Sequence, residues 1–421
     1  MSQWLSQVID EARQVTDYLE PVRQQAIAKL QQNGWPGRRN ESWRFTPLSS
    51  LEKRQFQAPS AGNTPVSSVE TITGLNAIEL VFVNGELVTN LAALSLPEGL
   101  TITSLAPDNA LQQQAIAELF GSIKPGHHVF GLVNDALCQQ GVYVDVAAGA
   151  KIEPVIRIIN QVDEDADTHN RILVRVGEGA SVRVMEQGEG SVSSVSTLFA
   201  EYCIADNAHL EHYRMVMFSD SARHIGGCHF KLHNASSLNS TLVGYGSELS
   251  RLDVDVIHAG EHANAKLNAI YLLAEGELFD LHTTIEHAMP NGTTEENARG
   301  IVGDRARAVF NGRIHIHRDA QKTLAELNNR NLLLSRRALI NTKPELEIYA
   351  DDVKCAHGAT VAEIEEKALY YLMTRGISRS KALVMLNFGF IQELVNQIPN
   401  KAISEWLLPK LSERFLMMEV K

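Results

Sequence analysis

Hydrophobic residues near the start of the chain recur at steps of three and four. This spacing gathers one apolar face on a helix, and it is carried by Leu5, Val8, Ile9, Ala12, Val15 and Leu19. The pattern predicts helix over residues 2–33, broken near Pro21 because proline cannot continue the hydrogen-bond ladder. Asn33-Gly34 ends the helix, since glycine favours the left-handed conformation of a C-cap.

The next apolar stretches have the length of short strands. Residues 78–83 and 86–88 are two such runs on either side of Asn84-Gly85. This dipeptide accepts the positive φ angles of a two-residue hairpin turn, so the pattern predicts a β-hairpin. Residues 1–120 are therefore expected to form a mixed region, helical first and β afterwards.

From about residue 125 the pattern changes to short runs of Val, Ile and Leu that alternate with polar residues. A short unit recurs along this part of the chain. It consists of a turn residue, an alanine, one or two further residues and then an apolar residue. The alanines are Ala150, Ala180, Ala208, Ala235 and Ala265, and weaker repeats follow near Asp304, Asp319 and Arg337. Their spacing is inside the range of about 20–50 residues that is typical of stacked structural repeats.

A repeat of this length cannot bury its own apolar face, whereas stacked coils share one core. We therefore predict a mainly β protein whose residues 121–358 form a parallel β-helix, also called a β-solenoid. A flat sandwich of two sheets is the competing fold, because periodicity alone does not separate the two.

Helical spacing returns in residues 359–421, which are expected to form a C-terminal helical domain. Apolar residues recur at helical steps from Leu369 onward, with breaks at Arg375-Gly376 and Pro399-Asn400. We expect these helices to cap the open end of the solenoid, whose last coil otherwise exposes its core and an unpaired strand edge.

Composition and charge exclude several classes of protein. The chain has 421 residues and a formal net charge of −12, which opposes general binding to nucleic acid or anionic lipid. There is no signal-like start and no apolar stretch of membrane-spanning length, so a cytoplasmic location is expected. The four cysteines are far apart, and we expect them to be reduced.

Common catalytic motifs are missing. The sequence contains no Gly-Lys dipeptide, so a phosphate-binding loop with its lysine is absent. His258 to His262 match a zinc-protease pattern, but Gly260 and the surrounding strand pattern disfavour the helix that this chemistry needs. Asp253 and Asp255 alternate on one predicted strand and could act as paired carboxylates, which leaves a carbohydrate-active β-helix enzyme as an alternative.

The most specific chemical feature is Asp351-Asp-Val-Lys-Cys-Ala-His-Gly358. Cys355 and His357 are two residues apart, so on a strand their side chains point the same way. A thiolate beside an imidazole is a plausible ligand pair for iron or zinc. The alternative is a small buried thiol near a polar histidine.

Several longer stretches resemble one known family. Asn331-Leu-Leu-Leu-Ser335, the run from Thr342 to Thr360, and Leu372 to Ile377 are closely similar to the SufB/SufD family of iron–sulfur cluster assembly proteins, and residues 40–48, 310–316 and 319–323 fit it too. Within the family the chain is more similar to the SufD branch. The SufB branch is expected to have glutamates on both sides of the matching histidine, whereas here Cys355 is two positions before His357 and Gly358 follows it. The resemblance implies a β-helix between helical ends.

The resemblance also implies a function. It suggests a non-catalytic scaffold subunit that supports cluster assembly and iron acquisition in a SufBCD complex. The expected partners are a SufB-like subunit through the β-helix and a SufC-like ATPase through the C-terminal helices, with a homodimer as an option for the isolated chain.

The same resemblance suggests site residues. His357, with Cys355 as companion, is expected to bind iron or a nascent cluster transiently at the SufB interface, and no tightly bound cofactor is expected. The apolar helix residues Leu369, Leu372, Ala382 and Leu386 are the candidates for an exposed surface that receives the ATPase.

Overall fold

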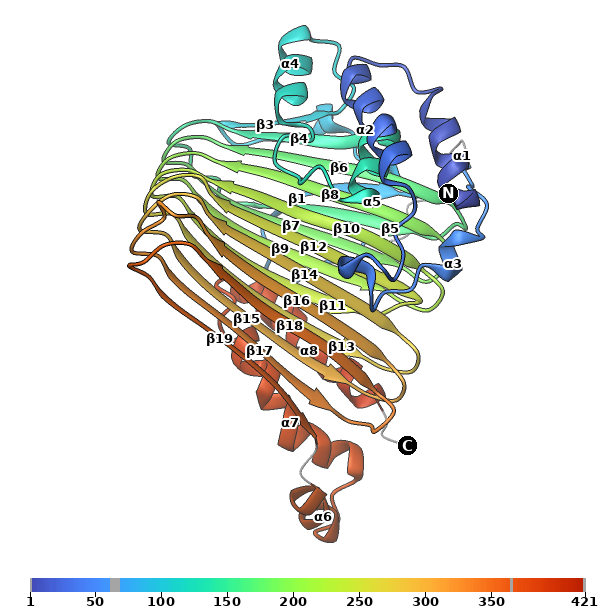
Figure 1. Ribbon diagram of the computed structural model, residues 1–421, viewed down its shortest axis with the longest axis vertical. Helices are drawn as coiled ribbons and strands as arrows, with labels where there is room; N and C mark the ends of the chain where they lie inside the picture. Colours follow the sequence, from blue (N-terminus) through green and yellow to red (C-terminus); the bar gives the residue numbers. More distant parts are fainter. Residues whose placement is uncertain (1, 61–68, 364–365, 419–421) are drawn as a thin grey trace.

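The computed structural model describes residues 2–60, 69–363 and 366–418. Two large β-sheets face each other at its centre, and helices from both ends of the chain lie outside them (Figure 1). The helices are α1 (Gln3–Ala12), α2 (Glu20–Asn33), α3 (Ser49–Glu52), α4 (Ala110–Leu119), α5 (Val129–Leu137), α6 (Glu366–Thr374), α7 (Arg379–Val395) and α8 (Lys401–Met417), with 3₁₀ turns η1 (Glu41–Trp43) and η2 (Leu91–Ala93).

Most strands are ten residues long and follow one another regularly. The strands are β1 (Ala77–Val83), β2 (Glu86–Leu87), β3 (Leu100–Ser104), β4 (Gln140–Val146), β5 (Val155–Val162), β6 (Asp167–Val176), β7 (Ser181–Gly190), β8 (Val195–Ile204), β9 (His209–Phe218), β10 (Arg223–Leu232), β11 (Ser237–Tyr245), β12 (Leu249–His258), β13 (Asn264–Leu273), β14 (Leu278–His287), β15 (Thr293–Val302), β16 (Arg307–Ile316), β17 (Leu324–Leu333), β18 (Leu339–Ile348) and β19 (Lys354–Glu363).

The N-terminal helices form as the apolar spacing predicts. Helix α1 begins after Ser2, whose side chain accepts a hydrogen bond from the Leu5 N–H, and it buries its apolar face. The chain then breaks before Pro21, which lies in the first turn of α2, where a missing N–H costs nothing. Gly34 follows α2 with a φ of 68°, so the predicted end of the helix is confirmed.

The predicted hairpin is also confirmed. Phe82 pairs with Leu87 and Val83 with Glu86, while Asn84 and Gly85 have φ angles of 49° and 87°. Strand β1 does more than the hairpin requires, because it also runs parallel to β5 and so starts the larger sheet.

Successive strands alternate between the two sheets. The order is β19-β17-β15-β13-β11-β9-β7-β5-β1-β2 in the ten-stranded sheet and β18-β16-β14-β12-β10-β8-β6-β4-β3 in the nine-stranded sheet. Neighbouring strands from β4 onward run parallel, since each is reached by one full coil of the chain. This connectivity confirms the predicted β-solenoid; a sandwich describes the two layers but not the path between them.

The tight corners confirm the period of the repeat and correct its register. Ala180 and Ala208 are the small buried residues at their corners, as predicted. Ala235 instead adopts the positive φ of its turn, at 51°, and Ala265 lies inside β13, opposite Leu238. The register is wrong at these two positions because similar small residues occur on both sides of a corner.

Apolar side chains fill the space between the sheets and also cover both outer faces. Phe199, Ile225 and Leu249 point outward from the nine-stranded sheet and pack against α1, α2 and α5. Met215 and Ile270 point outward from the ten-stranded sheet and pack against α7 and α8. Most strands are therefore buried on both faces, which is typical of parallel sheets.

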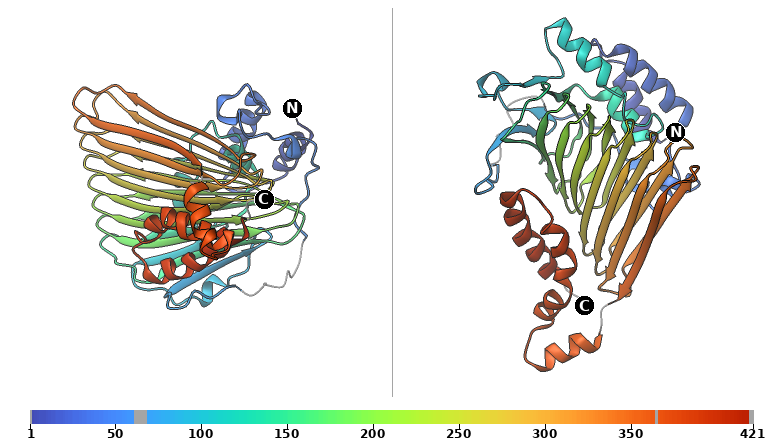
Figure 2. Two further views of the ribbon diagram at one scale, coloured as in Figure 1. Left: turned by 90° about the horizontal axis from the view of Figure 1, so that it is seen from below. Right: turned by 90° about the vertical axis from the view of Figure 1, so that its left-hand side faces the viewer.

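The C-terminal helices do not cap the end of the solenoid, so that prediction is wrong. Helices α7 and α8 lie along the outer face of the ten-stranded sheet, at the level of its middle strands (Figure 2). The apolar outer face of that sheet needs a cover, and the amphipathic helices supply it. Strands β18 and β19 remain at the free end, and β19 extends to Glu363, past the predicted boundary at residue 358.

Two further expectations can be compared with the structure. The four cysteines are all free, as predicted. No helix in the described ranges has the length and apolar character needed to cross a membrane.

Candidate functional site

The last coil of the solenoid leaves one end of the molecule open. Strand β18 pairs only with β16, and β19 pairs only with β17, among the described strands. Each therefore presents a row of backbone N–H and C=O groups with no strand beside it, which is a template for pairing with another chain. Figure 1 shows these two strands at the edge of the solenoid, with the C-terminal helices on the far side of the sheet.

Cys355 and His357 both lie on β19 at this open end. Their partners on β17 are the buried residues Ala325 and Leu327, so both side chains continue inward-facing rows of the sheet. Cys355 is half-buried against the main core, and burial raises the pKa of its thiol. His357 is exposed, because no further coil covers its row. The structure thus brings the two predicted ligands to one face.

A hydrogen-bonded string of polar side chains lies behind the open end. Asn331 donates from Nδ2 to Asn329 Oδ1 over 2.6 Å, and Thr342 donates from Oγ1 to the same oxygen over 2.8 Å. Asn329 in turn donates to the Tyr271 hydroxyl over 3.2 Å. These bonds connect β17 to β18 and hold the end strands in register without closing the end.

The open end does not hold a complete metal site by itself. In the described part of the chain, one group of three His, Cys, Asp or Glu side chains has its ligand atoms within 4.8 Å of one another, and it is Glu186, His212 and Cys228. A cluster needs three or four ligands, so Cys355 and His357 require others from outside this chain to bind one.

The four helix residues predicted to receive an ATPase divide into two groups. Leu369 and Ala382 are buried in the cluster between the helices and the ten-stranded sheet, so the structure does not expose them. Leu372 is partly buried, and Leu386 is 39% exposed. The expected exposed surface is thus wrong for Leu369 and Ala382, because helical spacing shows an apolar face but not what covers it.

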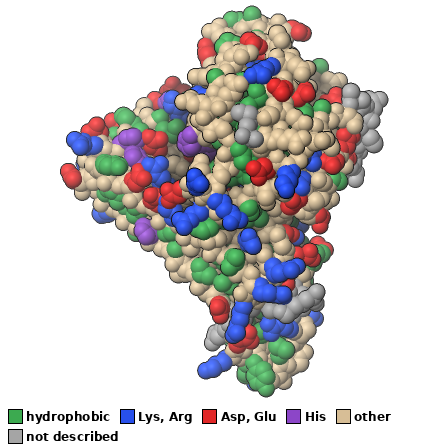
Figure 3. Space-filling model, turned by 45° about the vertical axis from the view of Figure 1, so that its right-hand side comes forward, with side chains coloured by type: hydrophobic (Ala, Val, Ile, Leu, Met, Phe, Trp, Pro, Cys, Tyr) green, Lys and Arg blue, Asp and Glu red, His purple; other side chains and the backbone are tan. Residues whose placement is uncertain are grey.

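Other apolar side chains on α6 and α7 are more exposed. Tyr370, Tyr371, Met373 and Met385 join Leu386 in a group that we call the α6–α7 patch, and Tyr370 is 70% exposed. Figure 3 shows hydrophobic side chains at the tip of this helical lobe, with lysine and arginine side chains around them. An exposed apolar group of this kind, with a charged rim, is typical of a protein-binding surface.

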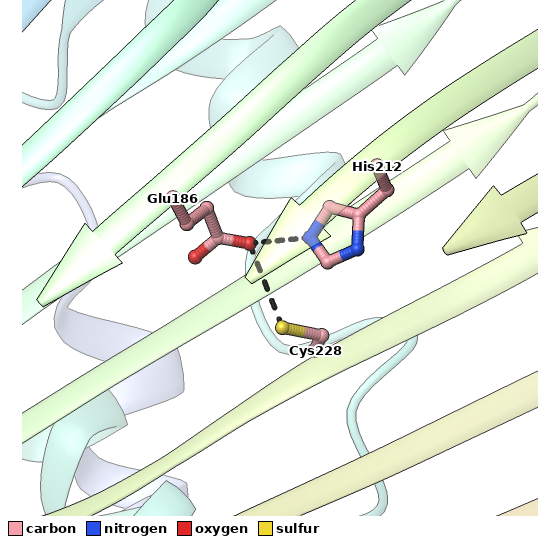
Figure 4. Close-up of side chains that lie close together, drawn as sticks. All are labelled: Glu186, His212 and Cys228. Carbon is pink, nitrogen blue, oxygen red and sulfur yellow. Dashed lines mark hydrogen bonds and ion pairs between the residues drawn. The ribbon is translucent and has the colours of Figure 1, made fainter. Parts of the chain in front are cut away.

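The Glu186 cluster lies inside the solenoid. Glu186 comes from β7, His212 from β9 and Cys228 from β10, and all three side chains point into the space between the sheets (Figure 4). His212 Nε2 is 2.9 Å and Cys228 Sγ is 3.5 Å from Glu186 Oε1. The Tyr202 hydroxyl donates to the same oxygen over 2.6 Å.

The charges in this cluster favour a closed network over a bound metal ion. Burial opposes ionisation of Glu186, but Arg214, which pairs with its second oxygen, and His212 lower its pKa to about 2. Burial and the Glu186 charge raise the pKa of Cys228 well above its usual value, so the thiol keeps its proton. A metal ion would have to displace that proton beside a guanidinium, in a site closed to solvent.

A second buried carboxyl group, Glu296, carries a different charge state. It lies on β15 and accepts one hydrogen bond over 2.7 Å, from the Thr283 hydroxyl. Its Oε2 atom has no hydrogen-bond partner among the described residues. Burial raises its pKa to about 7, above the value of 4.5 for an exposed glutamate. At neutral pH Glu296 is therefore only partly ionised, whereas an exposed glutamate is fully charged.

This shift predicts a pH-dependent gain in stability for Glu296→Gln. Because the pKa of Glu296 is raised in the folded state, the wild type is most stable below pH 4.5 and loses stability as the pH rises to about 7, where the unfolded carboxyl group ionises more readily than the folded one. This lowers the free energy of unfolding of the wild type by about 3 kcal/mol. Denaturant unfolding should therefore show that the free energy of unfolding of the variant, relative to that of the wild type, increases between pH 5 and pH 8. A constant difference across that range would contradict the assignment.

The pair Asp253 and Asp255 does not supply the protonated carboxyl group that a carbohydrate-active β-helix enzyme needs. Asp253 and Asp255 do share the outer face of β12, but Asp253 pairs with Arg251 and Asp255 hydrogen-bonds His229. Although burial opposes ionisation, these neighbours and His128 lower the pKa of both carboxyl groups. A glycoside hydrolase needs one of its carboxyl groups protonated, and neither is.

The zinc-protease pattern is likewise not supported. His258 is the last residue of β12, and His262 lies in the following corner with a φ of 57°. The two histidines are therefore not on one helix face, as the glycine between them indicated.

Sequence reasoning missed the buried groups at Glu186 and Glu296. Both occupy inward positions of strands on which most of the other inward residues are apolar or glycine, and this alternation is their only signal in the sequence. The inward positions of a strand can be told from its outward positions only when the register of the strand is known.

Comparisons with known proteins identify a matching family and several relatives of the chain. Residues 158–390 match the family model described as "SUF system FeS cluster assembly, SufBD core domain", and residues 5–158 match "SufBD protein N-terminal region". A relative in Escherichia coli, "Iron-sulfur cluster assembly protein SufD", is 29% identical over 94% of this chain and 92% of its own length. A SufBD family protein of Synechocystis is 31% identical over 86% of this chain and 84% of its own.

Proposed function

Because the chain belongs to the SufBD family of iron–sulfur cluster assembly proteins, we propose that it is the SufD-like scaffold subunit of a SufBCD complex. A role in iron–sulfur cluster assembly follows from the family and from its SufD relatives. The specific proposal is that the chain is not catalytic and supports assembly and iron acquisition at its interface with a SufB-like subunit.

The observation that carries this proposal is the open end of the solenoid. Strands β18 and β19 have unpaired edges there, and a second solenoid can extend both sheets by pairing with them. His357 is exposed at the same place, and Cys355 lies beside it in the row that faces inward. A partner that pairs with these strands therefore covers the two ligands.

The nascent cluster is the cargo of this interface and not a resident cofactor. Imidazole and thiolate suit iron, and the chain supplies two such groups where a cluster needs three or four. The remaining ligands come from the SufB-like side. In isolation, the same free edges allow a homodimer, which stays a prediction.

An ATPase supplies the energy in this proposal. The chain has no lysine-bearing phosphate loop, so ATP hydrolysis has to come from a partner. The α6–α7 patch is the surface offered to a SufC-like ATPase, because it combines exposed apolar side chains with basic neighbours such as Lys367, Arg375 and Lys381. Movement of the two solenoids, driven by the ATPase, would expose the ligands between them.

We expect Met385→Glu with Leu386→Glu to abolish capture of the ATPase. Two carboxylates in the α6–α7 patch would be left without partners in an apolar contact, which costs several kcal/mol of binding free energy. The measurement is co-purification of the full-length chain with SufB-like and SufC-like subunits. The SufB-like subunit should still co-purify, because the open end is unchanged.

The matched control is Leu111→Glu, which places the same charge at an exposed leucine of α4, 77% exposed and outside the patch. It should leave both partners bound. If the double variant folds and still retains the ATPase, the docking surface lies elsewhere.

A further inference from the structure

The two free strand edges at the open end differ in the backbone groups that they present. Along a strand, the N–H and C=O of one residue point to one side and those of the next residue point to the other side. At the start of β18 the Leu339 N–H donates to Ala306 O over 3.0 Å, and at its end the Tyr349 N–H donates over 3.0 Å to β16. Odd-numbered residues of β18 therefore bond to β16, and the even-numbered residues face the free edge.

Pro344 interrupts the free edge of β18. It is an even-numbered residue near the middle of this strand, opposite Gly312 of β16, so its nitrogen faces the free edge. Proline has no N–H to donate there, and its ring takes up space beside the strand. For this reason proline in a sheet is confined to edges, strand starts and bulges. A partner strand therefore cannot pair with β18 continuously across Pro344.

Charged side chains stand on both sides of this proline. They are Lys343, Glu345 and Glu347, all on the outer face of β18. Lys343 Nζ is 2.8 Å from Glu345 Oε2, and Glu347 pairs with Arg313 of β16. Proline and charged residues, lysine above all, are the means by which proteins protect an edge strand from pairing with another chain. Strand β18 is thus a protected edge.

Strand β19 lacks this protection. The Lys354 N–H donates to Thr323 O over 2.9 Å, so even-numbered residues of β19 bond to β17 and odd-numbered residues face the free edge. Residues 355–362 contain no proline, lysine, arginine, aspartate or glutamate, and most of them are exposed. The N–H and C=O groups that face the free edge are those of Cys355, His357, Ala359, Val361 and Glu363. They form a row without a gap.

Small side chains on the outer face of β19 leave room for a neighbouring strand. The outward residues between Lys354 and the end of the strand are Ala356, Gly358, Thr360 and Ala362. A Cβ atom built on Gly358 would have one neighbour within 4 Å, Asn328 Oδ1 at 3.4 Å. Side chains on paired strands approach to about 4.5–5.5 Å between their Cβ atoms. A partner strand with larger outward side chains therefore fits beside β19.

We propose that β19 makes the continuous main-chain contact with the partner solenoid, which adds one strand to the ten-stranded sheet by pairing with residues 355–363. On the nine-stranded sheet, the partner pairs with β18 on one side of Pro344 only. Main-chain hydrogen bonds supply the affinity in strand addition, so the unbroken edge of β19 determines how tightly the partner binds.

This inference rests on the proposed function, because the occupant of the edge is a strand of the SufB-like subunit. It narrows that function, since the two strands at the open end contribute unequally. The reason is the sequence of each edge: β18 has Pro344 and three charged side chains, and β19 has neither a proline nor a charged residue from Cys355 to Ala362.

The first test is calorimetric binding of the purified full-length chain to the SufB-like subunit, with Ala359→Pro as the variant. The lost N–H faces the free edge, so the ladder between β19 and β17 stays complete, and thermal unfolding checks that the variant is folded. We expect binding to weaken at least ~10-fold, because a carbonyl group of the partner is left buried without its donor. Ala359→Ser is the matched control; it keeps the N–H and should bind like the wild type.

The second test is amide hydrogen exchange of the wild-type chain, which needs no substitution. Addition of the SufB-like subunit should slow exchange at the free-edge amides along the whole of β19. In β18 it should slow exchange on one side of Pro344 at most.

The outcomes separate this inference from the proposed function. If the wild-type chain does not bind the SufB-like subunit, the proposed function is wrong and this inference with it. If the wild type binds and folded Ala359→Pro binds equally well, the inference alone is wrong. It is also wrong if exchange slows on both sides of Pro344 and not in β19.

Discussion

Cells that carry His357→Ala as their only copy of this chain should assemble the heteromeric complex normally and build clusters at least ~10-fold more slowly. The imidazole is exposed at the open end, where the partner is proposed to pair with β18 and β19. It contributes one of three or four ligands, and metal affinity falls ~10–100-fold even when an outer-shell contact is lost. The rate is measured by the activity of an iron–sulfur reporter enzyme.

The control for this experiment is Thr360→Ala on the same strand. Thr360 follows His357 by three positions, so its side chain points to the opposite face of β19, and it is also exposed. This variant should assemble and build clusters like the wild type. If His357→Ala builds clusters at the unmodified rate in an intact complex, the ligand role is wrong and His357 is an interface residue only.

The second large effect concerns stability: Glu186→Ala should lower the free energy of unfolding by about 3–5 kcal/mol. The substitution leaves the Arg214 guanidinium in the solenoid core without its carboxylate, and both side chains are at most 1% exposed. It also removes the acceptor of the Tyr202 hydroxyl and of His212. Denaturant unfolding, followed by circular dichroism, measures the loss.

Glu286→Ala is the matched control, because Glu286 also pairs with a strand residue, His317, but on the outer surface. Exposed ion pairs contribute less than about 1 kcal/mol, so this variant should unfold close to the wild type. A loss at Glu186 no larger than the loss at Glu286 would mean that the buried network does not hold the coils together.

Much of the architecture could be predicted from local patterns. The break before Pro21 and the turn at Asn84-Gly85 follow from the backbone angles that proline, asparagine and glycine prefer. The repeat predicted a solenoid because each coil carries too little apolar surface to fold alone. These features depend on residues that are near each other in sequence.

Features that depend on distant residues were harder to predict. The helices after residue 366 were expected to cap the solenoid, but α7 and α8 cover the outer face of the ten-stranded sheet. Their apolar spacing shows that they need a partner surface and says nothing about which surface that is. The same limit explains Leu369 and Ala382, which were expected on the exposed side and are buried.

The candidate ligands show the same division. Alternation on a strand placed Cys355 and His357 on one face, and the structure confirms it. The sequence pattern could not show that this face is at an open end, nor that His128 meets Asp255, which is 127 positions later in the chain. Such contacts are made by coils and loops that fold onto one another.

The sequence by itself determined the kinds of element, the period of the coils and the family, because propensity, turn chemistry and repeat spacing are encoded locally. Only the tertiary structure decided which apolar faces are covered, which end of the solenoid stays open and which carboxyl groups are charged. The physical reason is that burial and pKa depend on neighbours in space. In a solenoid these neighbours are one coil, or several coils, apart along the chain.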